Sequence, residues 1–186
     1  MTDGRRTIRR AVTLGGIGLH LGHQCRLTFR PAHTGEGIVF RRSDRPDAPA
    51  IPARVEHAVL SERRTQLGAG DDAIHTVEHV LSAIAGAEID DLVIEMDAPE
   101  PPILDGSARP FLDALTSAGI VTDGGAPEHL EITESIRIVD GDSVYEAHPA
   151  SSLELEVMID FPHPLIGRQE GRGTVTRGGY SRELAP

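Results

Sequence analysis

The clearest hydrophobic pattern along the chain lies in residues 74–86. At about 100° per residue, its aliphatic side chains fall on one stripe of a helix and its polar side chains fall on the opposite side. The aliphatic positions are Val77, Val80, Leu81 and Ile84, and the polar positions are His75, Glu78, His79 and Ser82. This pattern predicts a helix over residues 74–86, and Gly86 is a typical residue to end it.

Alternating apolar positions predict strands on both sides of this helix. Residues 7–31 are expected to form two strands around a glycine-rich turn, and residues 38–41 and 91–96 are expected to form one strand each. The segment 98–102 holds three prolines and is expected to be extended and stiff.

A second helix is predicted after Ser107, which is a suitable cap, and Gly119 is its expected end. Its apolar stripe consists of Phe111, Leu112, Leu115 and Ala118. Asp105 and Ser107 are interpreted equally well as capping residues and as residues near a functional site.

Residues 121–128 are rich in Gly, Asp and Pro, and they are the best candidate for a domain boundary. New strands are predicted after them, within 130–139, 144–147 and 153–161, as if a second α+β unit were starting. The sequence therefore predicts an α+β protein with two similar domains, each a β-sheet with helices packed on one face. The domains are expected at residues 1–126 and 127–186, with the second incomplete because the Gly- and Arg-rich residues after 164 show no helix.

The charge and composition exclude several classes of protein. The formal net charge of −11 argues against a general nucleic-acid binder, which needs a basic surface. No apolar run approaches the length of a membrane span, and the N-terminus shows no signal-peptide core, so a cytoplasmic location is expected. Cys25 is the only cysteine. A metal site would therefore have to be built from imidazole and carboxylate groups.

The polar side of the first predicted helix carries candidate chemistry. Two imidazoles four residues apart, with Glu78 beside the second, could hold a metal ion, activate water, or both. The spacing His75-x-x-Glu78-His79 also fits the motif of inverted zinc peptidases. A solvated helix face without any function explains the same residues.

Four stretches, taken together and in this order, resemble the UDP-3-O-acyl-N-acetylglucosamine deacetylase family. The stretches are Gly16-Ile17-Gly18-Leu19-His20, His75-Thr76-Val77-Glu78-His79, Asp105-Gly106-Ser107-Ala108 within 101–111, and Ile159-Asp160-Phe161 with His163-Pro164. The resemblance covers nearly the whole chain. It implies a zinc hydrolase of lipid A synthesis with two α+β domains, whose helices lie between two sheets and whose active site lies where the domains meet.

The resemblance also implies roles for particular residues. His79 matches a zinc ligand and Glu78 matches the general base, whereas His75 matches no ligand. Asp160 and Phe161 match a region near the uridine end of the substrate, an acylated UDP-N-acetylglucosamine. Asp105 lies in a family signature beside the site and is expected to have a supporting role.

The family's other two zinc ligands and a later catalytic histidine have no counterpart in these 186 residues. The remainder of the second domain is expected to complete the site, so the chain alone is expected to show little deacetylation. Two alternatives stay open: an inverted-motif zinc peptidase, which would use both His75 and His79, and a non-catalytic binding or assembly module.

Overall fold

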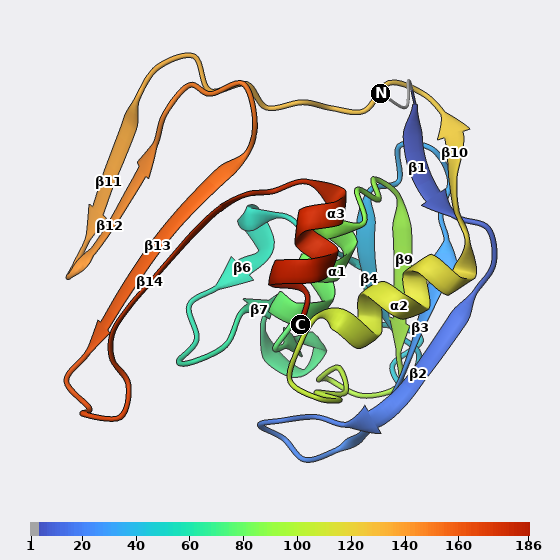
Figure 1. Ribbon diagram of the computed structural model, residues 1–186. Coiled ribbons are helices and arrows are strands. Elements are labelled where there is room, and N and C mark those ends of the chain that lie inside the picture. Colours follow the sequence, from blue (N-terminus) through green and yellow to red (C-terminus); the bar gives the residue numbers. More distant parts are fainter. Residues whose placement is uncertain (1–3) are drawn as a thin grey trace. The chain divides into compact units, whose positions relative to one another are not determined.

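A five-stranded sheet forms the centre of the larger part of the molecule. The computed structural model describes residues 4–186. The strands of this sheet are β2 (Val12–Ile17), β3 (Gln24–Pro31), β4 (Ile38–Arg42), β5 (Ile51–Pro52) and β9 (Leu92–Met96). They lie in the order β2-β3-β9-β4-β5, with β9 antiparallel to β3 and parallel to β4 (Figure 1). Because parallel neighbours need a long crossover, the chain between β4 and β9 has room for a helix.

That crossover contains α1 (Glu78–Gly86), which packs beside α2 (Arg109–Ala118) on one face of the sheet (Figure 1). The four apolar residues predicted for the second helix are all buried. The rings of Phe29 on β3 and Phe111 on α2 meet edge to face, with centroids 6.4 Å apart. Gly119 has a φ of 79° and ends α2, so the predicted stripe and stop of this helix are confirmed.

Short elements surround this core. A three-stranded sheet of β6 (Ala58–Val59), β7 (Gln66–Leu67) and β8 (Ile74–His75) precedes α1. The single turn η1 (Val55–His57) comes before β6, and the single turn η2 (Gly70–Asp72) lies between β7 and β8. Strand β1 (Arg5–Ile8) pairs with β10 (Ile120–Gly124). Residues 121–128 were expected to be a domain boundary, but β10 covers the first half of this segment. That half is therefore part of a sheet.

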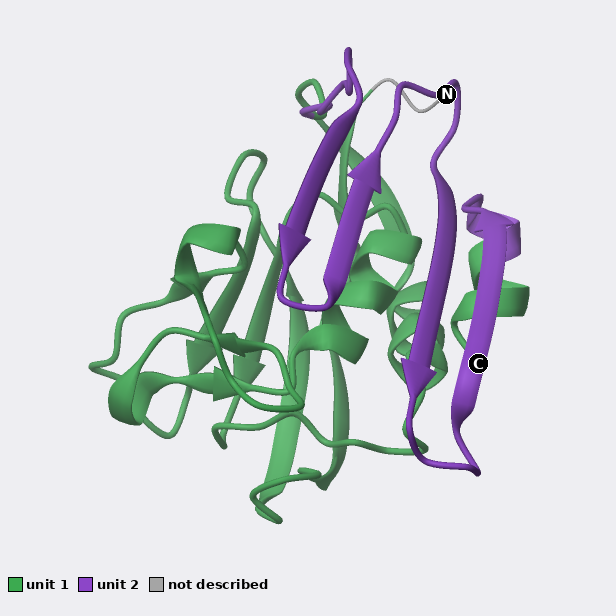
Figure 2. Ribbon diagram, turned by 90° about the vertical axis from the view of Figure 1, so that its left-hand side faces the viewer, with its two compact units in different colours: residues 1–127, 180–186 green, residues 128–179 purple. Residues whose placement is uncertain are grey.

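The chain divides into two compact units (Figure 2). Unit 1 contains the elements above together with residues 180–186, and unit 2 is Glu128–Gly179. Unit 2 consists of two antiparallel hairpins and the single turn α3 (Arg177–Gly179). The hairpin strands are β11 (Ile136–Asp140), β12 (Ser143–Ala147), β13 (Glu154–Phe161) and β14 (Gly167–Thr174). The α+β class is confirmed, and the domain boundaries predicted at 1–126 and 127–186 stay a prediction.

The last residues return to unit 1 as a short π-helical turn, η3 (Tyr180–Leu184). The Tyr180 hydroxyl and the Ser82 hydroxyl of α1 are 2.7 Å apart and share a hydrogen bond. The ring of Tyr180 also lies so close to Gly86 that a Cβ there would come within 2.1 Å of it. Within residues 4–186, the structure holds no helix with both the length and the apolar character that crossing a membrane requires.

Candidate active site

A left-handed residue separates the two halves of the predicted first helix. Ile74 and His75 form β8, where His75 lies opposite Gln66 of β7. Thr76 then has a φ of 55°, and α1 begins only at Glu78. The prediction of one helix over residues 74–86 is therefore wrong in its first turn, because a left-handed residue cannot continue a right-handed helix.

His75 is consequently not on the same helix as His79, and the spacing expected of an inverted zinc peptidase does not lie along one helix face. Burial, aided by the nearby charge of Arg64, lowers the pKa of His75. Its Nδ1 atom is buried and has no hydrogen-bond partner among the described residues. These observations favour a neutral histidine packed beside the site over a second ligand on the helix.

Glu78 and His79 occupy the first turn of α1. Backbone N–H groups at this end of a helix favour a nearby negative charge. Both side chains are half-buried, and Oε2 of Glu78 accepts a hydrogen bond of 3.1 Å from the backbone N–H of Thr65. The fold thus presents a carboxylate and an imidazole at consecutive positions of a helix start, both partly shielded from water.

Asp105 lies close enough to His79 for the two side chains to interact electrostatically. Its Oδ1 accepts hydrogen bonds from the backbone N–H of Ser107 at 3.0 Å and from the Ser107 hydroxyl at 2.9 Å. These bonds, with a smaller contribution from the charge of His79, lower the pKa of Asp105. The Ser107 hydroxyl in turn accepts a hydrogen bond from the N–H of Arg109 at the start of α2, so Asp105 supports the start of this helix.

Main-chain hydrogen bonds bring the first three family-like stretches together. The N–H of Ile103 donates to the carbonyl of Ile17 at 2.9 Å, and the N–H of His75 donates to the carbonyl of Pro99 at 2.9 Å. The proline-rich segment therefore lies between the glycine-rich turn and the residues before α1. The sequence indicated only a stiff connector here and did not point to Glu100, a charged residue among prolines. The side chain of Glu100 is completely buried.

Asp160 and Phe161 lie in the other unit. They end β13, where they pair with Arg168 and Gly167 of β14. Both side chains are exposed, and the ring of Phe161 is 51% accessible. The structure thus brings Glu78, His79 and Asp105 into one region, and the roles predicted for all five residues stay predictions.

The described residues do not fit a complete zinc centre. No group of three or more His, Cys, Asp or Glu side chains within residues 4–186 is arranged to hold a metal ion. Catalytic zinc sites usually have three protein ligands. One zinc ligand is predicted at His79, and the described residues do not complete a set of three.

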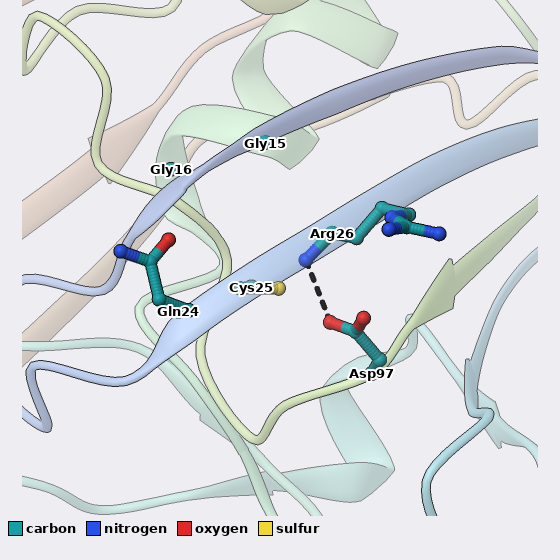
Figure 3. A pocket seen from close by; sticks show the side chains of 6 residues that line it. All are labelled: Gly15, Gly16, Gln24, Cys25, Arg26 and Asp97. Atoms are coloured by element: carbon teal, nitrogen blue, oxygen red, sulfur yellow. Dashed lines mark hydrogen bonds between the residues drawn. The ribbon is translucent and has the colours of Figure 1, made fainter.

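A separate hollow lies along β2 and β3 (Figure 3). It has a volume of about 350 Å³ and is lined by Gly15, Gly16, Gln24, Cys25, Arg26 and Asp97. The N–H of Arg26 donates to Oδ1 of Asp97 at 2.6 Å. Burial, together with the charge of Asp97, raises the pKa of Cys25 to about 12, so its thiol is not a nucleophile at neutral pH. The hollow contains none of the predicted site residues.

The fold is α+β, and it presents Glu78 and His79 at the start of a helix. Comparison with known proteins makes the class specific. The family model described as LpxC, UDP-3-O-acyl N-acetylglycosamine deacetylase, matches residues 5–186. The chain belongs to this family.

Three relatives illustrate the similarity. The chain is 38% identical over 181 residues to the UDP-3-O-acyl-N-acetylglucosamine deacetylase of Bdellovibrio bacteriovorus, covering 97% of this chain and 60% of the relative. It is 39% identical to the enzyme of the same name from Brucella melitensis, covering 97% and 63%. It is 40% identical over 184 residues to the bifunctional enzyme LpxC/FabZ of Chlorobaculum tepidum, covering 98% and 39%. The chain thus spans less than two thirds of the length of these relatives.

Proposed function

We propose that this chain forms part of a UDP-3-O-acyl-N-acetylglucosamine deacetylase, in which Glu78 is the general base and His79 is one ligand of a zinc ion. The observation that carries the proposal is the adjacent carboxylate and imidazole on the first turn of α1, with Asp105 in electrostatic reach. The family match over residues 5–186 supports the reaction. A cytoplasmic step of lipid A biosynthesis follows as part of the same proposal.

The reaction adds water to the carbonyl carbon of the N-acetyl group and breaks the C–N bond, releasing acetate and a free amine. Glu78 would accept a proton from the attacking water, because a positioned carboxylate within hydrogen-bond reach can act as a general base. Its bond from the N–H of Thr65 holds one oxygen in place and leaves the other for water. An imidazole such as that of His79 is a suitable zinc ligand. Further ligands and an acid for the departing amine would have to come from residues outside 4–186.

The substrate class is part of the proposal. Asp160 and Phe161 would contact the uridine end of an acylated UDP-N-acetylglucosamine. In support, β13 presents a carboxylate and an exposed aromatic ring at adjacent positions, and both side chains are accessible. An aromatic ring can stack on a base, and a carboxylate can accept hydrogen bonds from one.

A chimera tests this function. Residues 1–186 would replace the matching segment of the Brucella melitensis relative, and acetate release from the acylated nucleotide sugar would be measured. We expect turnover, a fall in kcat of about 10²- to 10⁴-fold for Glu78→Gln, and no change for Glu95→Gln. Glu95 is a matched control because it lies on the sheet, paired with Arg30. A chimera that is folded by circular dichroism but releases no acetate would overturn the proposal.

The isolated 186-residue chain is expected to show little or no deacetylation, because the described residues lack a three-ligand set. The same observation favours one alternative, a non-catalytic binding or assembly module. Stoichiometric zinc in the purified chain would count against that alternative. Turnover by the purified chain that disappears in Glu78→Ala would show that the chain is active alone.

A further inference from the structure

Glu100 is a completely buried carboxylate that no proposed chemical step uses. Its side chain is 0% exposed, and it lies in the proline-rich segment between β9 and α2. No arginine or histidine side chain within residues 4–186 forms an ion pair with it. A buried charge held in this way does not generally add stability, because an apolar side chain of similar size often serves as well or better. Its presence therefore calls for a role other than packing.

Hydrogen bonds from two distant segments hold this carboxylate. Oε1 accepts from the Thr76 hydroxyl at 2.6 Å and Oε2 accepts from the N–H of Leu21 at 2.8 Å, while the N–H of His20 is 3.0 Å from both oxygens. Burial alone would raise the pKa of Glu100, but these bonds outweigh it and keep the pKa below its ordinary value. The group is therefore an anion that links the glycine-rich turn to Thr76, two residues before α1.

The backbone around Glu100 is shaped to allow this contact. A Cβ at Gly18 would come within 2.5 Å of Oε2, so only glycine lets the turn approach the carboxylate so closely. Thr76 is held in the left-handed region, which a β-branched residue adopts only when its surroundings impose it. The Thr76 hydroxyl bond to Glu100 is such a constraint.

The bond between Thr76 and Glu100 constrains the backbone just before Glu78 and His79. The residue that precedes α1, Val77, makes no side-chain capping bond, so no local cap determines where the helix starts. Thr76 comes immediately before it, and its left-handed backbone sets the direction in which α1 leaves β8. Glu78 and His79 are the first two residues of α1, so their directions depend on this turn.

We propose that Glu100 is a positioning residue, whose carboxylate joins residues 18–21 to Thr76 and thereby fixes the backbone from which Glu78 and His79 project. The role of Glu78 and His79 rests on the proposed function above. The contact itself needs neither substrate nor metal, because its partners are all in unit 1.

The test compares Glu100→Gln with Asp91→Asn in the 186-residue chain by NMR. Glutamine keeps the size of Glu100 but has one acceptor oxygen, so it cannot satisfy all the donors around it. We expect amide exchange at His20 and Leu21 to become about 10- to 100-fold faster, and the Cα shifts of Glu78 and His79 to change. Asp91 is a matched control, since its carboxylate is also 0% exposed but contacts Arg5 and Gly37.

In Asp91→Asn the Cα shifts of Glu78 and His79 should stay as in the wild type. Adding Thr76→Gly to Glu100→Gln should return these shifts toward wild-type values, because glycine adopts a positive φ without a Cβ penalty. A purely structural role for Glu100 would give no such rescue. If Glu100→Gln does not fold, Thr76→Val, which removes only the hydroxyl donor, decides the question.

Unchanged shifts of Glu78 and His79 in Glu100→Gln, or in Thr76→Val where the first variant does not fold, would overturn the proposal. Equal shifts in Glu100→Gln and Asp91→Asn would also overturn it. Because these spectra contain no substrate and no metal, they are independent of the acetate assay. An inactive chimera with a changed spectrum for Glu100→Gln would reject the proposed function and keep the positioning role.

Discussion

Unit 1 and unit 2 both contain strands with alternating apolar residues, but only unit 1 buries them. In β3, Cys25, Leu27 and Phe29 are at most 3% exposed. In β13, Leu155 and Ile159 alternate in the same way and remain 44% and 40% exposed. The difference is the second layer: α1 and α2 cover the sheet of unit 1, whereas the only helix described in unit 2 is the single turn α3.

Strand formation and burial are two separate properties, although one sequence pattern is used to predict both. Alternation identifies a strand, because side chains point to opposite faces in turn. Burial also requires a layer packed on one of those faces. Full burial of a large apolar side chain contributes about 1.5–3 kcal/mol, so the stability of this chain should come mainly from unit 1.

The largest expected effect is in the core of unit 1. Phe29→Ala should lower the free energy of unfolding by about 3–5 kcal/mol, because Phe29 is 0% exposed and contacts Phe111. The matched substitution in unit 2, Phe161→Ala, should change it by less than about 0.5 kcal/mol. Urea denaturation of both variants measures the difference, and equal losses would contradict the contrast between the units.

The next largest effect concerns Asp91, which ties β1 to the sheet. Asp91→Asn should cost about 3 kcal/mol, because it breaks a buried pair with Arg5. Burial would raise the pKa of Asp91, but the Arg5 bonds outweigh it and lower the pKa. Its stabilisation is therefore present above the unfolded pKa of about 3.9, and it is lost as the pH falls through the lower folded value. Denaturation at pH 7 and at pH 3 should show a smaller pH effect in Asp91→Asn than in the wild type.

A smaller effect is expected where the end of the chain meets α1. Gly86→Ala would place a Cβ against the ring of Tyr180, so the ring must move. We expect a loss of about 1–3 kcal/mol and faster proteolytic removal of residues 180–186. Ala85→Gly is a control at an exposed neighbour on the same helix. It should cost about 1 kcal/mol through helix propensity alone, without exposing the terminal segment to protease.

The smallest expected effect is a pH dependence of stability near neutral pH, caused by His75. Burial lowers the folded pKa of His75 below its ordinary value of 6.5. The contribution of His75 to stability is then fully present above the unfolded pKa and is lost as the pH falls from that value through the folded one. His75→Gln should reduce the loss of thermal stability between pH 7.5 and pH 5.5. An unchanged loss in this variant would show that other groups cause it.

The sequence predicted α2 and the strands β3, β4 and β9 correctly because local signals and packing agree there. The stripe of α2 and the stop at Gly119 follow from local periodicity, and the sheet behind α2 accepts the same residues. Strand β14 was missed because glycines at 167, 171 and 173 leave no apolar alternation, although its partner β13 has one. Residues 167–174 form a strand because they pair with β13, and their own sequence carries no signal for this pairing.

The predicted start of the first helix was wrong for a related reason. The stripe of Val77, Val80 and Ile84 fits a helix that begins earlier, and no local residue forbids one. The left-handed Thr76 depends on Glu100, which lies 24 residues away in the sequence. The sequence could indicate Glu78 and His79 as candidate site residues because they are neighbours in the chain. The contact between Thr76 and Glu100 could not be predicted, because its two residues lie far apart in the sequence.

The return of the chain to unit 1 at Tyr180 has a consequence for proteolysis. Unit 2 is connected to unit 1 at both of its ends, and the later connection is held by the buried Tyr180 and Ala185. A single protease cut in a turn of unit 2 would therefore leave two fragments joined through η3 and α1. Such a nicked protein should run as one species under native conditions and as two under denaturing conditions.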